Sequence, residues 1–367
     1  MKIVSQRRYD IDWLRVLGVL LLVPFHASQI FIINPNSIMY VKDTINSPAL
    51  IGMAGFIHMW HMPLLFFVSG SATYFALCFR SAGQYARERF LRLFVPLIFG
   101  ILTYIPLTTY IQRSKTISLP EAYLGFFQID FAHLDGLNGT FTPAHLWFIL
   151  YLFAFSLIGL PLFLALRTER GMNAIGNMGE AIPLPLTLLL FGVPLTFAAA
   201  MNILGDKNPI YYFLVFFYGF LIASDARFQE GIDKLTWGFL AFGIFAAMVQ
   251  ITALTNYPEW TPAWIARGLL YEMGRWTLTL AVLGLGHRFL YRGNNLLRYA
   301  NEAAMPFFLL HMTFTVLTGF FVTQINAPVV FKYPLIVLIA TGSTLLAYEL
   351  VRSWKVTRWL FGMKIIK

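Results

Sequence analysis

Charged residues are scarce in this sequence. Asp, Glu, Lys and Arg make up 12% of the 367 residues, whereas a soluble domain normally carries about a quarter. Hydrophobic residues reach 58%, and they form apolar runs that are too long and too many for soluble domains. The composition therefore excludes a soluble enzyme. It predicts an all-α polytopic membrane protein in which residues 1–367 form a single membrane-embedded domain.

Cysteine is almost missing as well. The single residue of this type, Cys78, lies in an apolar run, so an internal disulfide and a cysteine-based metal site are both excluded. His58 and His61 are three residues apart, but no third ligand follows them nearby. We therefore expect no bound metal and no bound cofactor.

The formal net charge of +10 does not indicate nucleic-acid binding, because the basic residues gather at the ends of apolar segments and alternate from loop to loop. This distribution is typical of membrane topology. It places most of the 27 Lys and Arg residues on the cytoplasmic side together with both termini. The membrane that we expect for this integral protein is a bacterial-type inner membrane. The ten predicted transmembrane helices are residues 13–33, 56–79, 91–111, 146–166, 183–203, 209–224, 235–255, 272–291, 303–323 and 331–351.

His26 is the most informative polar residue in these segments. It follows Arg15 after ten mostly apolar residues, which on a helix is a separation of roughly 16 Å along the axis. Arg15 can then lie at the headgroups while His26 lies deep in the hydrocarbon. A buried ionisable group in a membrane span is costly and commonly functional. Neutral imidazole is also the natural general base near neutral pH.

Other polar side chains allow two interpretations each. Asp12 and Arg15 share a helix face, as an ion pair that ends the span or as the lining of a cytoplasmic entrance. Arg89 and Arg92 are membrane anchors or a phosphate-binding pair. Ser69 and Gly70 permit close helix packing, or Ser69 stabilises an oxyanion. Further polar positions that we expect to line a path towards His26 are His61, His145, Trp147, Glu302 and His311.

Five motifs in this order suggest a family. They are Asp12-x-x-Arg15 with His26, Phe66-Phe67-Val68-Ser69-Gly70, Arg89-x-x-Arg92-x-x-x-Pro96, His145-Leu146-Trp147-Phe148 and Pro306-Phe-Phe-Leu-Leu-His311. Over residues 9–351 the chain resembles the acyltransferase type 3 family of integral membrane O-acyltransferases. Within that family it looks nearest to glucan-modifying members that add succinyl groups.

The resemblance implies that an acetyl or succinyl group moves from cytoplasmic acyl-CoA, the co-substrate, to a hydroxyl of an extracytoplasmic carbohydrate of the cell envelope. It implies that His26 is the catalytic histidine, with Arg15 and Asp12 as its partner motif. Arg89 and Arg92 would bind the donor, together with Ser69 and Gly70. The expected partners are therefore acyl-CoA, a carbohydrate or small hydroxyl acceptor and the lipid bilayer.

Several alternatives stay open from the sequence alone. His26 could act as a general base or form an acyl-histidine intermediate. The chain could instead be a transporter or exporter of an anionic metabolite, with His26 and Arg15 as substrate or proton sites, or a non-catalytic assembly subunit. Release of CoA thiol only when an acceptor is present would distinguish the enzyme from the transporter. The sequence does not specify the acyl group, the acceptor, its side of entry or the oligomeric state.

Overall fold

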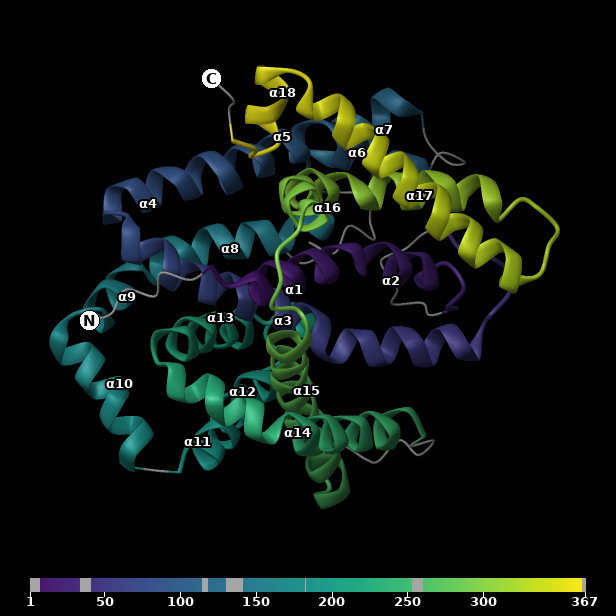
Figure 1. Cartoon of the computed structure of the whole chain (residues 1–367). Coiled ribbons are helices and arrows are strands. Elements are labelled where there is room, and N and C mark those ends of the chain that lie inside the picture. The colour runs from purple at the N-terminus through teal and green to yellow at the C-terminus, as the bar shows by residue number, and fades with distance from the viewer. Residues whose placement is uncertain are drawn as a thin grey trace. The chain divides into compact units, whose positions relative to one another are not determined.

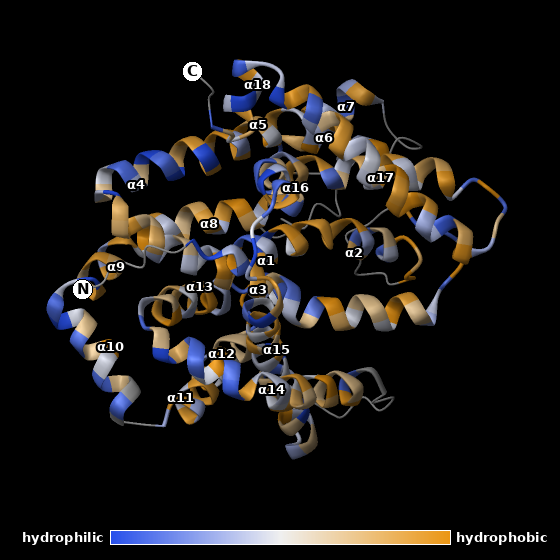
Figure 2. Cartoon of the chain, in the orientation of Figure 1, coloured by the Kyte–Doolittle hydropathy of each residue, from blue (hydrophilic) through white to orange (hydrophobic). Residues whose placement is uncertain are grey.

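The computed structural model describes residues 7–33, 41–113, 118–129, 141–181, 183–252 and 260–364, and these residues form helices and connecting turns with no strand among them. Within these ranges, five helices are long and apolar enough to cross a membrane, or seven if each of two bent helix pairs is one span. Hydrophobic colouring runs along most of α3 (Pro48–Phe79) and α17 (Val329–Arg352), whereas α4 (Ala82–Arg89) is largely hydrophilic (Figure 2). The chain is therefore an all-α polytopic membrane protein, as predicted.

Over most of its described residues, each of the ten predicted segments coincides with helix in the structure (Figure 1), and residues 253–255 of the segment 235–255 lie outside the described residues. In chain order they fall on α1 (Tyr9–Leu20) with α2 (Leu22–Gln29); α3; a π-helix η1 (Phe90–Phe94) with α5 (Val95–Leu102) and α6 (Tyr104–Arg113); α8 (Trp147–Ile158) with α9 (Leu160–Leu166); α11 (Leu184–Leu190) with α12 (Gly192–Ala200); α13 (Pro209–Ser224); α14 (Ala226–Thr252); α15 (Pro262–Phe289); α16 (Asn295–Val322); and α17.

Three of these segments fall short of the length or hydropathy that marks a span. Leu184–Ala200 is a shorter apolar stretch, α13 has 16 residues, and α15 contains the charged residues Glu272 and Arg275. The number of ten spans and the cytoplasmic location of the termini therefore stay predictions.

The helices divide into two compact units, each built from three stretches of the chain. Unit 1 comprises Met1–Gly18, Gly55–Ala86 and Ala154–Leu297, and unit 2 comprises Val19–Ala54, Arg87–Phe153 and Arg298–Lys367. The remaining elements are α10 (Glu169–Ala181) and a 3-10 turn η3 (Gly205–Lys207) in unit 1, and α7 (Leu119–Phe126), a 3-10 turn η2 (Ala144–Leu146) and α18 (Lys355–Leu360) in unit 2. Because neither unit is contiguous in the chain, no boundary between them could be predicted from the sequence.

Proline explains where three of the helices are interrupted. α1 ends at Leu20, α5 at Leu102 and α11 at Leu190, and a proline follows four residues after each: Pro24, Pro106 and Pro194. A proline has no N–H to donate to the carbonyl four residues earlier, so the helix breaks there. At the second break the chain bends by 44°, and the Tyr123 hydroxyl of α7 donates a hydrogen bond of 2.7 Å to the Leu102 carbonyl.

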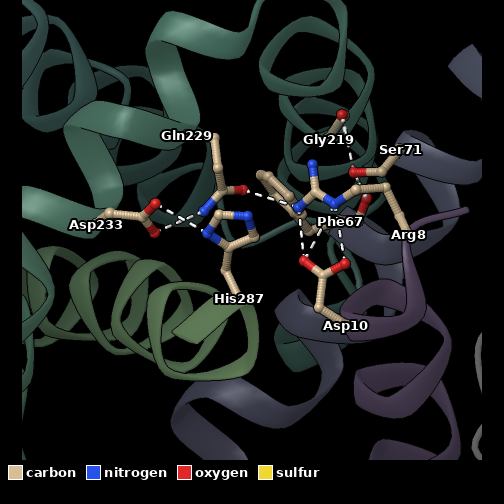
Figure 3. A network of polar contacts seen from close by, with 8 residues as sticks. All are labelled: Arg8, Asp10, Phe67, Ser71, Gly219, Gln229, Asp233 and His287. Carbon is tan, nitrogen blue, oxygen red and sulfur yellow. Dashed lines mark hydrogen bonds and ion pairs between the residues drawn. The ribbon is translucent and has the colours of Figure 1, made fainter. Parts of the chain in front are cut away.

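In unit 1, α3 and α13 touch through their backbones. A Cβ added at Gly70 would collide with the Phe216 carbonyl oxygen, and one added at Gly219 would collide with that of Phe67. The Ser71 hydroxyl, on α3, donates to the Gly219 carbonyl at 3.0 Å (Figure 3). Such contacts between small residues are typical of helices that associate in membranes.

In unit 2, the apolar core gathers side chains of α2, α16 and α17. Ile30, Met312, Val316 and Ile336 are almost fully buried within it. Beside this core, the Lys332 ammonium of α17 forms a buried ion pair of 2.7 Å with Asp43, in the segment after α2. Lys332 is thus a buried and paired residue near the start of the predicted segment 331–351.

Candidate functional site

Three histidine rings from distant parts of the sequence meet in unit 2. His26 comes from α2, His145 from η2 and His311 from α16. The His311 ring centroid lies 5.4 Å from that of His26 and 5.2 Å from that of His145. All three side chains are buried. The structure therefore brings together His26 and two of the residues predicted to lie along a path towards it.

Backbone carbonyls determine which ring nitrogens of this histidine cluster carry a proton. His311 Nδ1 lies 2.7 Å from the Phe308 carbonyl oxygen, and His145 Nε2 lies 3.0 Å from that of Leu309. A carbonyl only accepts, so each of these nitrogens is the protonated one. In the neutral rings, His311 Nε2 and His145 Nδ1 then carry lone pairs. Both atoms are buried and have no hydrogen-bond partner among the described residues.

Tyr104, at the start of α6, lies beside the ring of His145 in this cluster. Its ring centroid lies 6.5 Å from that of His145, and its buried hydroxyl likewise lacks a partner in the part of the chain that the structure describes. Gly100 provides the space, because a Cβ at that position would collide with this hydroxyl. Tyr104 was not predicted as a site residue, because a tyrosine at the end of an apolar run is common in membrane proteins.

The cluster is not arranged as a metal site. Within the described residues, no three His, Cys, Asp or Glu side chains are placed to share a metal ion. What the cluster offers instead is two acceptor nitrogens beside the rings of Tyr104, Phe307 and Phe308. Unsatisfied buried polar atoms are costly, so this group of atoms is suited to a polar ligand.

Asp12 and Arg15 form the expected ion pair in unit 1. Arg15 Nη2 lies 2.8 Å from Asp12 Oδ1, and Arg7 Nη2 lies 2.8 Å from Asp12 Oδ2. Asp12 therefore holds two arginines at the start of α1. The interpretation as an ion pair is confirmed, and a role of the same residues at an entrance stays a prediction.

Arg89 and Arg92 lie where α4 passes into the π-helix η1 in unit 2. The N–H of Val95 donates to the Phe90 carbonyl five residues earlier, and Pro96 has no N–H for the Arg92 carbonyl. Arg92 also pairs with Glu88 at 3.2 Å. A π-helical turn of this kind is frequent at functional sites.

The C-terminal segment packs against this π-helix. Gly362 adopts a left-handed φ of +68°, and a Cβ there would lie 2.6 Å from the Arg92 carbonyl oxygen. Arg358 of α18 is buried and pairs with Glu302 at 2.8 Å. Glu302 thus anchors the C-terminal segment, and a role for it beside the acceptor stays a prediction.

The other predicted site residues lie outside the histidine cluster. His61 Nε2 is 2.6 Å from the Gly18 carbonyl oxygen in unit 1. The Ser69 hydroxyl donates to the Leu65 carbonyl of its own helix at 2.8 Å, and Gly70 serves the close packing of α3 on α13. Trp147, in unit 2, packs edge-on against Tyr151.

A second polar network in unit 1 ties the start of the chain to α14 and α15 (Figure 3). Arg8 pairs with the buried Asp10 at 2.6 Å and donates to the Gln229 side chain at 3.0 Å. Gln229 in turn donates to Asp233, and the other oxygen of Asp233 lies 2.8 Å from His287 Nδ1. Arg8 is 221 positions from Gln229, and Asp233 is 54 positions from His287, so no sequence pattern predicted this network.

Comparison with known proteins identifies the family. A family model described as an acyltransferase domain matches residues 8–348. The chain belongs to this acyltransferase family. It is therefore a membrane acyltransferase, as the five motifs predicted.

The curated relatives that match the acyltransferase are distant but cover it almost completely. Glucans biosynthesis protein C from Salmonella paratyphi B is 23% identical over 98% of this chain and 96% of its own length. The protein of the same name from Salmonella agona is 24% identical, with the same coverage. No solved structure gave a significant match. In this acyltransferase, the histidine cluster is thus defined by its own geometry and not by a structural relative.

Proposed function

We propose that this acyltransferase moves an acyl group from cytoplasmic acyl-CoA to a hydroxyl of an extracytoplasmic carbohydrate, with His26 as the general base. The observation that carries the proposal is the buried histidine cluster, where His145 and His311 present lone pairs that the described protein does not use. A reactive hydroxyl needs such acceptors around it. The apolar surroundings also keep water from hydrolysing the donor thioester.

The chemical step assigns one role to each member of the cluster. His26 takes the proton of the acceptor hydroxyl while the hydroxyl oxygen attacks the thioester carbonyl carbon. The C–S bond then breaks, and the protonated His26 returns its proton to the leaving CoA sulfur. His311 and His145 accept hydrogen bonds from the acceptor through Nε2 and Nδ1. Tyr104 is the donor to the oxyanion in place of Ser69, whose hydroxyl is bound within its own helix.

The donor would meet the basic residues of the predicted cytoplasmic side. Arg89 and Arg92 are one helical turn apart, which suits two guanidinium groups for the phosphates of CoA. The π-helix and the left-handed Gly362 hold the backbone at Arg92 in a specific shape. Arg15 would contribute positive charge at the entrance, with Asp12 fixing its orientation.

The acceptor is proposed to be a glucan of the cell envelope, with the protein in the inner membrane. The support for this class is that proteins named glucans biosynthesis protein C match over nearly the whole chain. The acyl group is acetyl or succinyl.

The test is a turnover assay with the purified protein in lipid nanodiscs. Acetyl-CoA and succinyl-CoA are supplied with glucose oligosaccharides, CoA thiol is followed with a thiol reagent, and the product is weighed by mass spectrometry. We expect thiol release that requires the oligosaccharide, and an oligosaccharide that gains one acyl mass. His26→Gln should lower kcat by about 10²–10⁴-fold.

His287→Gln is the matched control, since His287 pairs with Asp233 outside the cluster. This variant should keep the activity of the wild type. Equal activity of His26→Gln and the wild type would rule out His26 as the base. Thiol release without acylated product would rule out the proposed acceptor, and acylation that proceeds only with another donor would rule out acyl-CoA.

A further inference from the structure

A second group of buried polar and aromatic side chains lies in unit 1, apart from the residues that the reaction uses. Arg275 and Glu272 are on α15, Tyr211 is on α13, and Trp60 is on α3. Arg275, Glu272 and Tyr211 are each at least nine-tenths buried. Ionisable residues inside a membrane helix are costly, and they commonly indicate a functional site.

Arg275 is held in place from three sides. Its Nη1 donates to both carboxylate oxygens of Glu272 at 3.0 and 3.1 Å, and its Nε donates to the Met59 carbonyl at 3.3 Å. That carbonyl is available because Pro63, four residues later in α3, has no N–H for it. The guanidinium carbon lies 4.3 Å from the ring centroid of Tyr211 and 5.6 Å from that of Tyr271.

Two donors on the helices that contact Arg275, α13 and α3, are unsatisfied. The Tyr211 hydroxyl and the Trp60 indole N–H are buried and have no partner among the described residues. Trp60 and Tyr271 both pack against the small core that contains Met59, the residue whose carbonyl Arg275 binds. Buried donors without a partner are uncommon in proteins, and a bound ligand with acceptor groups would satisfy them.

The charges of the group indicate what kind of ligand fits. The positive charge of Arg275 is balanced by the negative charge of Glu272, with which it forms a buried ion pair. At the edge, His58 lies 3.7 Å from the exposed carboxylate of Asp206. An anion would gain little from a guanidinium that is already paired, whereas a neutral molecule with many hydroxyls can use aromatic faces together with a few fixed polar groups.

We propose that Tyr211, Trp60, Tyr271 and the Arg275–Glu272 pair form a subsite for uncharged sugar units of the acceptor. The Tyr211 hydroxyl and the Trp60 N–H bind sugar hydroxyls, and the ring of Tyr271 packs against a sugar face. Solvent reaches the edge of the group at His58, whose side chain is 35% exposed. The inference rests on the proposed carbohydrate acceptor, and it assigns part of the recognition of that acceptor to unit 1.

The test is equilibrium dialysis of labelled tetrasaccharides against the full chain in nanodiscs, without any acyl donor. The probes are maltotetraose, sophorotetraose, laminaritetraose and cellotetraose, with tetragalacturonate as the anionic counterpart. We expect at least one neutral tetrasaccharide to bind, and to bind more tightly than the anionic one. Tyr211→Phe keeps the ring beside Arg275 and removes only the hydroxyl. The Kd of the variant for the neutral tetrasaccharide should therefore be about five- to tenfold higher than that of the wild type. Trp60→Phe should have a similar effect.

Tyr218→Phe is the control, because Tyr218 is a buried tyrosine of the same helix that stacks on Phe191. It should leave the Kd unchanged. The subsite is refuted if no neutral tetrasaccharide binds, if tetragalacturonate binds more tightly, or if Tyr218→Phe weakens binding as much as Tyr211→Phe.

The turnover assay separates this inference from the proposed reaction. Acyl transfer that depends on His26 without measurable effect of Tyr211→Phe on sugar binding would overturn the subsite and leave the reaction in place. Sugar binding that depends on Tyr211 in a protein that transfers no acyl group would overturn the reaction and keep the subsite.

Discussion

At the scale of single residues, the catalytic proposal depends on protonation, and protonation depends on two carbonyls of α16. Phe308 and Leu309 bind the opposite ring nitrogens of His311 and His145. Two consecutive carbonyls of one helix therefore leave Nε2 of His311 and Nδ1 of His145 as acceptors. A histidine motif in the sequence cannot show this, because the tautomer is decided by the partner of each ring.

Substitution by an amide side chain can replace the ring nitrogen that binds the carbonyl and remove the acceptor nitrogen of the same ring. The Asn side chain reaches about as far as His Nδ1 and the Gln side chain about as far as Nε2. His311→Asn and His145→Gln should thus keep the carbonyl contacts and lose the acceptor nitrogens. We expect both variants to fold with a Tm near that of the wild type and to lose about tenfold or more in kcat. A kcat unchanged in both variants would contradict a role of these nitrogens in the reaction.

Lys42 gives a prediction about pH. Its ammonium donates to the Gln29 and Ile32 carbonyls, and burial lowers the pKa of Lys42 from its usual 10.5 to about 8. Between these values the unfolded chain binds a proton that the folded chain does not, so this lysine makes the stability rise with pH in that window. Thermal unfolding from pH 8 to 10 should show a smaller gain in Tm for Lys42→Met than for the wild type. Parallel curves would disprove the lowered pKa.

At the scale of elements, proline and glycine determine how the helices end and meet. The breaks after Leu20, Leu102 and Leu190 follow from prolines four residues later. The contact of α3 with α13 follows instead from Gly70 and Gly219, where each helix lies against a carbonyl of the other. The breaks could be read from the sequence in hindsight, but the pairing of these two glycines could not.

Gly70→Ala should destabilise the protein. The added methyl group would press against the Phe216 carbonyl and force α3 and α13 apart, at a cost of about 1–3 kcal/mol. Gly55→Ala is the control in the same helix, since a Cβ there meets open space and should stabilise by up to about 1 kcal/mol through helix propensity. Denaturation of both variants in detergent measures the difference. The same shift in both would show that helix propensity, and not the close contact, governs these positions.

At the scale of the whole molecule, the open question is how many helices cross the membrane. Ten spans require that the 16 residues of α13 cross it, with residue 206 outside and residue 230 inside. Asp206 and Glu230 are both exposed. In a Cys78→Ala background, intact spheroplasts should label Asp206→Cys with an impermeant maleimide, and inverted vesicles should label Glu230→Cys. Labelling of both positions from the same side would reject the ten-span topology.

The sequence predicted the helices well because long apolar runs need no tertiary information. Each of the ten predicted segments falls on helix, and His26, His145 and His311 were singled out as polar groups in such runs. Other roles could not be predicted. Glu302 reads as a polar intrusion until Arg358 of α18 is found beside it. Lys332 lies in the predicted segment 331–351, but its distant partner Asp43 could not be read from the sequence.

The sequence by itself thus determined that this protein lies in a membrane, where its helices run and which motifs relate it to acyltransferases. These properties depend on hydrophobicity and local spacing, which are present in any short stretch of the chain. Only the tertiary structure decided that three imidazoles meet, that Tyr104 joins them, and that Arg275 lies between two tyrosines. Such contacts join residues far apart in the chain, and their energies depend on burial and on the partners available there.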